Sequence, residues 1–188
     1  MKRRVRSLIS MSLIAGSLLF ASCGDSKKEE KEVVTEENHP HQHSEKTADH
    51  KSTEEAMASF NDETIKKAFD EYVAVKDALV QTNPVAAAEK AASLQSTLTE
   101  VKPEIAVVAG KIAGADDVNV QRELFSELTA AMEPVLKEAI TSGKIYKQFC
   151  PMAFEGKGDY WYSTSEEIMN PYFGDKMLKC GRVDETIM

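Results

Sequence analysis

Residues 117–143 read DVNVQRELFSELTAAMEPVLKEAITSG, and the spacing of their apolar residues decides the fold. Apolar side chains recur three or four positions apart, which places them on one face of a long helix. The predicted face consists of Val120, Leu124, Leu128, Met132, Val135 and Ala139, with Phe125, Leu136 and Ile140 beside it. Asp116 or Asp117 is suited to cap the start of this helix. We expect Pro134 to kink or break it, because proline removes one backbone hydrogen bond.

The residues before this stretch show the same spacing twice. The first apolar face consists of Ile65, Phe69, Tyr72, Lys76 and Leu79, and the second of Ala87, Ala91, Leu94, Leu98 and Val101. The first face predicts a helix over about 62–81, with Asn61 or Ser59 as its cap. Asn83-Pro84 is a typical start for the second helix, which should end before Pro103.

Residues 60–142 therefore predict an antiparallel helical bundle with short connections. Within it, residues 104–114 form a short helix or an irregular link. From Ile145 onward, aromatic residues, glycines and prolines replace the helical periodicity. We expect an irregular aromatic segment, containing Cys and Met, that packs on the bundle. The predicted fold class is all-α, and the predicted folded domain spans residues 59–188.

The start of the chain has the features of a bacterial lipoprotein signal. Basic residues precede an apolar stretch from Leu8 to Phe20, which is short for a membrane-spanning helix. Two small residues then precede Cys23, as in a lipobox. We expect residues 1–22 to be a signal peptide, Cys23 to be the lipidated N-terminus and residues 23–58 to be a disordered polar tether. An ordinary secretory signal or an uncleaved anchor is the alternative. In the lipoprotein form, the lipid holds the protein in the bacterial cell envelope, facing the periplasm or the cell surface.

The charge and the histidine content exclude or disfavour several classes of function. The chain has 23 Lys and Arg against 31 Asp and Glu, a formal charge of −8. Because nucleic-acid binding needs a basic surface, this charge argues against a nucleic-acid-binding protein. All four histidines lie between positions 39 and 50. The predicted domain therefore supplies no histidine as a general base, and the chain has no glycine-rich phosphate loop. We expect a binding protein and not an enzyme.

Two cysteines and two methionines of the C-terminal segment are the candidates for chemistry. Cys150 and Met152 flank a proline, and Met177 and Cys180 lie three residues apart. Soft sulfur ligands select soft ions, above all Cu(I) or Ag(I), whereas zinc sites combine Cys with His or carboxylates. The other interpretation is a Cys150–Cys180 disulfide, which is common in exported proteins, with both methionines in the core. Both interpretations stay open, and they can coexist as a redox-dependent site.

A second candidate site lies in the predicted tether. His39, His41 and His43 are separated by single residues, and His50 follows. Clustered imidazoles can capture Cu(II), Zn(II) or Ni(II). The alternative is a solvated linker whose histidines happen to cluster. Metal capture here would be weak and exchangeable.

The chain also resembles a known family. From about Ile65 to Gly181 it is similar to the bacterial domain-of-unknown-function family 3347. The residues that carry the resemblance are Tyr146, Cys150-Pro151-Met152-Ala153, Gly158, Tyr160-Trp161, Ser163, Ile168, Asn170-Pro171-Tyr172-Phe173-Gly174, Met177 and Cys180-Gly181. Family members occur as exported proteins and fused to periplasmic adaptors of copper and silver efflux pumps, which implies a role in metal handling. Cys150-Pro151-Met152 also resembles the Cys-Pro-Met-His motif of small heavy-metal-binding domains in such pumps, although Ala153 replaces the histidine.

Together these observations predict an envelope lipoprotein that binds Cu(I) or Ag(I) through Cys150, Met152, Met177 and Cys180. The expected role is metal buffering, tolerance or handover to efflux. Its partners would be the metal ion, the membrane through the lipid anchor, and an efflux adaptor or another envelope protein. The alternative is a structural or partner-binding lipoprotein with a Cys150–Cys180 disulfide and no metal role.

Overall fold

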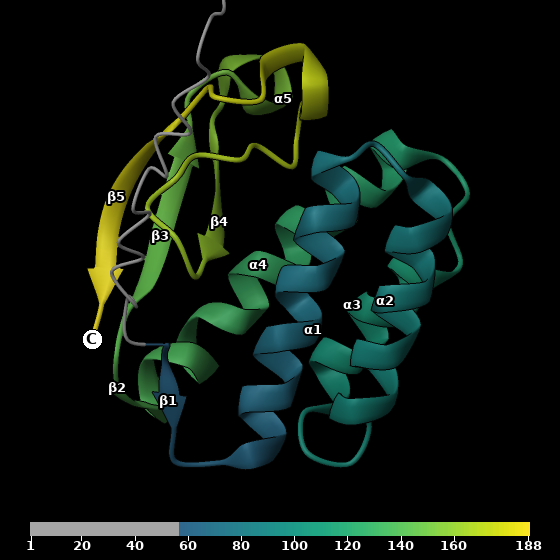
Figure 1. The fold of residues 1–188 in the computed structure, drawn as a ribbon. Coiled ribbons are helices and arrows are strands. Elements are labelled where there is room, and N and C mark those ends of the chain that lie inside the picture. Colours follow the sequence, from purple (N-terminus) through teal and green to yellow (C-terminus); the bar gives the residue numbers. More distant parts are fainter. Residues whose placement is uncertain (1–56) are drawn as a thin grey trace, which may run out of the picture. The chain divides into compact units, whose positions relative to one another are not determined.

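The computed structural model describes residues 57–188, and four helices form its main part (Figure 1). They are α1 (Glu63–Val80), α2 (Pro84–Leu98), α3 (Pro103–Ala113) and α4 (Val118–Ala139). Consecutive helices pack against each other, and α4 returns to contact α1. The helical bundle predicted for this region is therefore present. None of the helices in the described residues is long and apolar enough to span a membrane.

Asp62 caps the start of α1, although the sequence pattern predicted Asn61 or Ser59. The carboxylate of Asp62 accepts hydrogen bonds from the backbone N–H groups of Thr64, at 2.7 Å, and Ile65, at 3.3 Å. These bonds satisfy two of the unpaired donors of the first helical turn. Neither Asn61 nor Ser59, the predicted caps, has this role.

Other helix ends follow the predicted signals. Asn83 caps α2 through a hydrogen bond from the backbone N–H of Ala86, and Pro84 is the first residue of that helix. Asp117 caps α4. The region around residues 104–114 is a helix, α3, which ends directly before Gly114.

Helix α4 continues through Pro134, so the predicted break does not occur. Pro134 lies on the exposed side of the helix, and Ala130, whose carbonyl loses its helical partner, is exposed as well. Water can therefore bond this carbonyl. Met132 and Val135 are buried on either side of the proline and hold this part of the helix in the core.

The buried face of α4 differs from the predicted one in its first turns. Val120 is 46% exposed, whereas the polar residues Gln121 and Arg122 are buried. The side-chain nitrogen of Gln121 donates hydrogen bonds to the carbonyls of Pro84, at 2.9 Å, and Ala115, at 2.7 Å. A buried polar group is tolerated when it is hydrogen-bonded in this way. Apolar periodicity does not reveal such positions.

The C-terminal segment is a sheet, which corrects the all-α prediction. Strands β3 (Ile145–Cys150), β4 (Asp159–Ser163) and β5 (Arg182–Ile187) form an antiparallel sheet in the order β4-β3-β5. Two short strands, β1 (Ser59–Phe60) and β2 (Ile140–Ser142), form a second one. The short helices α5 (Ala153–Gly156) and η1 (Gly174–Met177) lie in the connections. The fold is thus helix-rich with two small antiparallel sheets.

Strand β3 escaped prediction because its buried face is not uniformly apolar. Tyr146, Gln148 and Cys150 alternate along one face and are buried. The side-chain nitrogen of Gln148 donates to carbonyls of the loop after β4. Phe149, on the other face, is only half-buried and packs on Tyr160, with 4.7 Å between ring centroids. A half-buried strand normally buries its apolar residues and exposes its polar ones. In β3 this alternation is inverted at Gln148 and Phe149, so the sequence did not reveal the strand.

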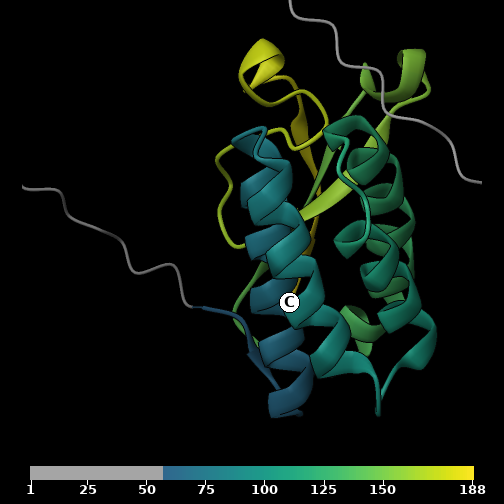
Figure 2. The same cartoon turned by 90° about the vertical axis from the view of Figure 1, so that its right-hand side faces the viewer.

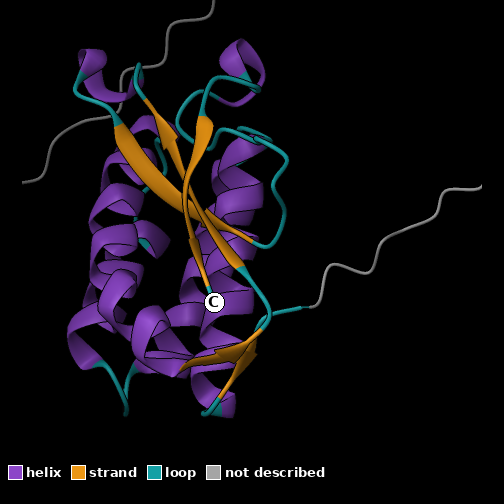
Figure 3. Cartoon of the chain, turned by 90° about the vertical axis from the view of Figure 1, so that its left-hand side faces the viewer, coloured by secondary structure: helices purple, strands orange, loops and turns teal. Residues whose placement is uncertain are grey.

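The three-stranded sheet lies along one side of the helical bundle (Figure 3). The edge strand β4 is the strand that contacts the helices α4 and α1, and η1 also contacts α1. From the other side, the helices stand in front of the strands (Figure 2). The sheet and its connecting loops carry both cysteines of the described residues.

Candidate functional site

The two cysteines singled out by the sequence lie together. The sulfur atoms of Cys150 and Cys180 are 3.6 Å apart, and both residues are free thiols. Cys150 is the last residue of β3, and Cys180 comes shortly before β5. Because Phe149 is paired with Arg182 across these two strands, the ladder itself brings the two cysteines to one end of the sheet.

The two thiols differ in their access to solvent. Cys150 is 0% exposed, whereas Cys180 is half-buried. Burial raises the pKa of the Cys180 thiol above its ordinary value, and the contact with Cys150 raises it further. A nearby cation would counteract this effect, because it stabilises the thiolate.

A buried asparagine positions the segment that carries Cys180. The side-chain nitrogen of Asn170 donates a hydrogen bond to the carbonyl of Cys180 at 2.7 Å. Its side-chain oxygen accepts from the backbone N–H groups of Tyr172, at 2.8 Å, and Phe173, at 3.3 Å. The N–H of Cys180 donates to the carbonyl of Met177 at 3.0 Å. The sequence analysis did not indicate this bond from the side chain of Asn170 to Cys180.

Gly181 allows the chain to pass close to the sheet beside Cys180. Its φ angle of 150° lies in a region that favours glycine. A Cβ atom here would lie 2.9 Å from the ring of Trp161 and 3.0 Å from the carbonyl oxygen of Phe149. The close approach therefore requires glycine. It also brings Trp161, the one tryptophan of the chain, next to the residue that follows Cys180.

Buried aromatic residues lie close to the thiol pair. The rings of Trp161 and Tyr172 meet edge to face with 6.1 Å between centroids, and Phe154 contacts Tyr172 at 5.2 Å. Burial raises the pKa of Tyr172 well above its ordinary value, and Cys150 is one of the neighbours that add to this effect. The thiol of Cys150 is therefore buried near an aromatic residue.

The predicted methionine ligands are in different environments. Met152 directly precedes α5 and is 52% exposed, whereas Met177, the last residue of η1, is half-buried. Met169 is less suited to bind a cation, because its sulfur lies 3.3 Å from the ammonium group of Lys179. Within residues 57–188, no group of three or more His, Cys, Asp and Glu side chains is placed to hold a metal ion. A site at the thiols would therefore use thioethers or an external ligand.

The other predicted sites lie outside the described residues. These are the lipidation site Cys23 and the histidines His39, His41, His43 and His50.

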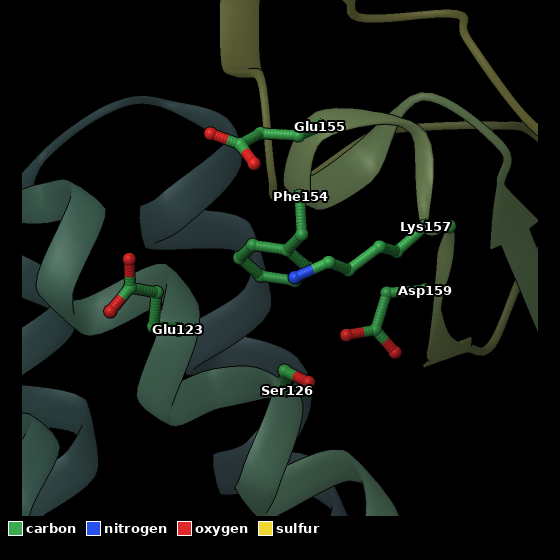
Figure 4. A pocket seen from close by; sticks show the side chains of 7 residues that line it. Glu123, Ser126, Phe154, Glu155, Lys157 and Asp159 are labelled. Carbon is green, nitrogen blue, oxygen red and sulfur yellow. The ribbon is translucent and has the colours of Figure 1, made fainter.

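A separate cleft of about 560 Å³ opens between α4 and the turn around α5 (Figure 4). Its lining residues are Glu123, Ser126, Phe154, Glu155, Lys157, Gly158 and Asp159. Phe154 and Glu155 have φ angles of 49° and 61°, in the left-handed region. Neither thiol lines this cleft, which has mixed charge and was not indicated by the sequence.

One comparison with known proteins gives a match. Residues 68–144 match the model of a family described as "Protein of unknown function (DUF3347)", which is the family that the sequence resembled. The matched range covers most of the helical bundle and ends before Cys150. The C-terminal residues on which the resemblance was based thus lie beyond it. No match was found among curated proteins or solved structures.

Proposed function

We propose that the protein, whose residues 68–144 match the model of the DUF3347 family, binds a soft metal ion, Cu(I) or Ag(I). The proposed ligands are the thiolates of Cys150 and Cys180, supplemented by the thioethers of Met152 and Met177. The observation that carries the proposal is the 3.6 Å separation of the two cysteine sulfurs. One small ion can contact two sulfurs at this distance with little movement of the backbone.

The chemistry of the donors favours a soft ion. Thiolate and thioether sulfurs select Cu(I) over harder ions. A structural zinc site needs four ligands, usually Cys and His, and all four histidines of the chain precede residue 51. The aromatic residues Trp161 and Tyr172, both buried, would shield the ion on one side from water. The partly open position of Cys180 would let it enter and leave.

A site that the metal ion can enter and leave beside Cys180 suits metal transport more than catalysis. We propose that the protein buffers the ion or hands it over to an efflux system, for which an efflux adaptor or another envelope protein would be the partner. Lipidation at Cys23 would hold it at a membrane of the cell envelope. His39, His41, His43 and His50 would form a weaker capture site in the tether.

The test is a Cu(I) titration under anaerobic, reducing conditions against a chromophoric chelator. The chain from residue 23 onward would be used with Cys23→Ser, which removes the third thiol. Since the chain has one tryptophan, fluorescence of Trp161 reports binding near the thiols. We expect one tightly bound Cu(I), and we expect Cys180→Ser to weaken binding at least tenfold.

The thioethers are tested by exchanging both proposed methionine ligands for leucine. Met152→Leu with Met177→Leu nearly conserves side-chain volume, so folding should be preserved while the affinity for Cu(I) falls. The matched control is Met169→Leu, since that sulfur already contacts Lys179. Unchanged affinity in the double variant would remove the methionines from the ligand set. Unchanged affinity in Cys180→Ser would overturn the proposal.

The same thiol contact also favours the second candidate, a structural disulfide in a partner-binding lipoprotein. This function predicts that the reduced protein binds no Cu(I) and loses stability when the disulfide is reduced. A disulfide that closes a loop of this length stabilises a fold by roughly 3 kcal/mol. Thermal unfolding of the oxidised and reduced forms, without metal, measures this stabilisation, and the Cu(I) titration of the reduced protein separates the two functions.

A further inference from the structure

The unequal exposure of the two thiols suggests that they have different chemical roles. A molecule in solution cannot contact the sulfur of Cys150, which is fully buried at the end of β3. It can contact Cys180, which is half-buried in the connection before β5. Only 3.6 Å separates the two sulfurs. An adduct formed on Cys180 is therefore within reach of Cys150.

The surroundings allow the two sulfurs to approach further. A disulfide bond is about 2.05 Å long, so the sulfurs must move together by about 1.5 Å. Cys150 is fixed in the sheet by its pairing with Asp159. Cys180 lies outside a strand and is followed by Gly181. Most of this movement can thus come from the side chain and loop of Cys180.

We infer that Cys150 and Cys180 form an oxidisable dithiol, in which Cys180 reacts with an external disulfide and Cys150 then completes the internal disulfide. In the first step, the Cys180 thiolate attacks one sulfur of the external disulfide. A mixed disulfide forms and one thiolate leaves. In the second step, the Cys150 thiolate attacks the Cys180 sulfur, the Cys150–Cys180 bond forms, and the second thiolate leaves. The protein loses two electrons and two protons, and the external disulfide becomes two thiols.

The consequence for metal binding rests on the proposed function. Both thiolate ligands are consumed when the internal disulfide forms, so the oxidised protein should release or refuse Cu(I). The redox state of one pair of residues would then decide whether the site is available. The thiol chemistry itself needs no metal and can be tested without one.

The test uses glutathione disulfide as the oxidant and intact mass as the readout. The chain from residue 23 onward, with Cys23→Ser, is treated in the presence of a chelator. The protein with both Cys150 and Cys180 should lose the mass of two hydrogen atoms and carry no stable glutathione adduct. Cys150→Ser should accumulate one glutathione adduct, because the resolving thiol is missing. Cys180→Ser, kept folded, should react at least tenfold more slowly, because its remaining thiol is buried.

A second measurement covers the case in which Cys150→Ser fails to fold. The wild-type reaction is quenched with acid at early times and the peptides are mapped, with glutathione expected on Cys180 and not on Cys150. Equal labelling of both cysteines, or a pair that stays reduced in excess glutathione disulfide, would overturn the inference. A protein that oxidises as described but binds no Cu(I) when reduced would instead overturn the proposed function alone.

Discussion

The hydroxyl group of Tyr72 accepts a hydrogen bond from the backbone N–H of Tyr162 at 3.2 Å, which joins α1 to the free edge of β4. The same hydroxyl lies 2.7 Å from the hydroxyl of Thr129 in α4. Burial raises the pKa of Tyr72 far above its ordinary value, so the group keeps its proton. One buried hydroxyl therefore connects two helices and the sheet that carries the thiol pair.

Removing this hydroxyl should destabilise the fold without changing its shape. Tyr72→Phe removes the acceptor of the Tyr162 N–H and the bond between the hydroxyls of residues 72 and 129 in the core. An unpaired buried polar group costs about 1–3 kcal/mol, and we expect a loss of this size in the free energy of unfolding. Urea unfolding followed by the fluorescence of Trp161 measures it.

The control for this prediction is a double-mutant cycle with Thr129→Val. If the two hydroxyls are bonded, the second substitution should cost less in the Tyr72→Phe background than in the wild type. Additive effects would show that this bond does not contribute.

Arg122 should be needed to hold the C-terminal loop on the bundle. Its guanidinium donates to the carbonyl of Pro171 at 2.8 Å and to the carbonyl of Leu79, near the end of α1, at 3.2 Å. Arg122→Met removes both bonds, and although the carbonyl of Leu79 keeps a backbone N–H donor, the carbonyl of Pro171 loses its bond from the guanidinium, so we expect a loss of about 1–3 kcal/mol in the free energy of unfolding. The control is Lys111→Met. The side chain of Lys111 is 54% exposed, and its ammonium nitrogen lies 3.7 Å from a carboxylate oxygen of Glu127, which is longer than a hydrogen bond. Exposed pairs of this kind contribute at most about 1 kcal/mol. Similar losses in both variants would contradict the role of Arg122.

Glu133 should make the stability of the protein depend on pH in the acid range. Its carboxylate accepts hydrogen bonds from Lys147, at 2.7 Å, and Lys137, at 2.9 Å, which lower its pKa from about 4.5 to about 2. A lowered pKa in the folded state means that the ionised form stabilises the fold. This stabilisation is complete above pH 4.5 and is lost as the pH falls toward 2.

The measurement compares the wild type with Glu133→Gln by urea unfolding between pH 7 and pH 2. The wild type should be the more stable protein at pH 7, and the difference should shrink over the window from about 4.5 to about 2. A difference that stays constant over this range would show that Glu133 does not titrate in the folded protein as described.

The helices could be predicted because their buried faces are mostly apolar. The residues of α1 that were predicted to face the core, such as Phe69 and Leu79, are indeed buried. The prediction of buried positions failed where polar side chains are buried and hydrogen-bonded to distant backbone groups. Arg122 and Gln148 are such cases, since their partners lie in loops whose position depends on the whole fold.

The candidate site was predictable to a similar degree. A pair of cysteines in the C-terminal segment indicated that Cys150 and Cys180 belong together, and their sulfurs do lie in contact. Their different exposure could not be derived, because it depends on a strand that the sequence did not reveal. The bond from Asn170 to Cys180 depends in the same way on a turn whose geometry only the fold defines.

This bond leads to a prediction about metal affinity. Asn170→Asp keeps the oxygen atoms that accept the N–H groups of Tyr172 and Phe173, but it removes the N–H donor to the carbonyl of Cys180. Cys180 would then be held less firmly beside Cys150. A hydrogen bond contributes about 1 kcal/mol, so we expect the dissociation constant for Cu(I) to rise about fivefold to tenfold.

The matched control is Asn119→Asp, which makes the same chemical change at an exposed position near the start of α4. It should leave the Cu(I) affinity unchanged, and thermal unfolding would establish that both variants are folded. The added negative charge of Asn170→Asp attracts a bound cation but also raises the pKa of a nearby thiol, so the affinity is compared over a range of pH, and a weakening that persists at high pH reports the loss of positioning. An affinity equal to that of the wild type would show that metal binding does not depend on how Asn170 holds Cys180.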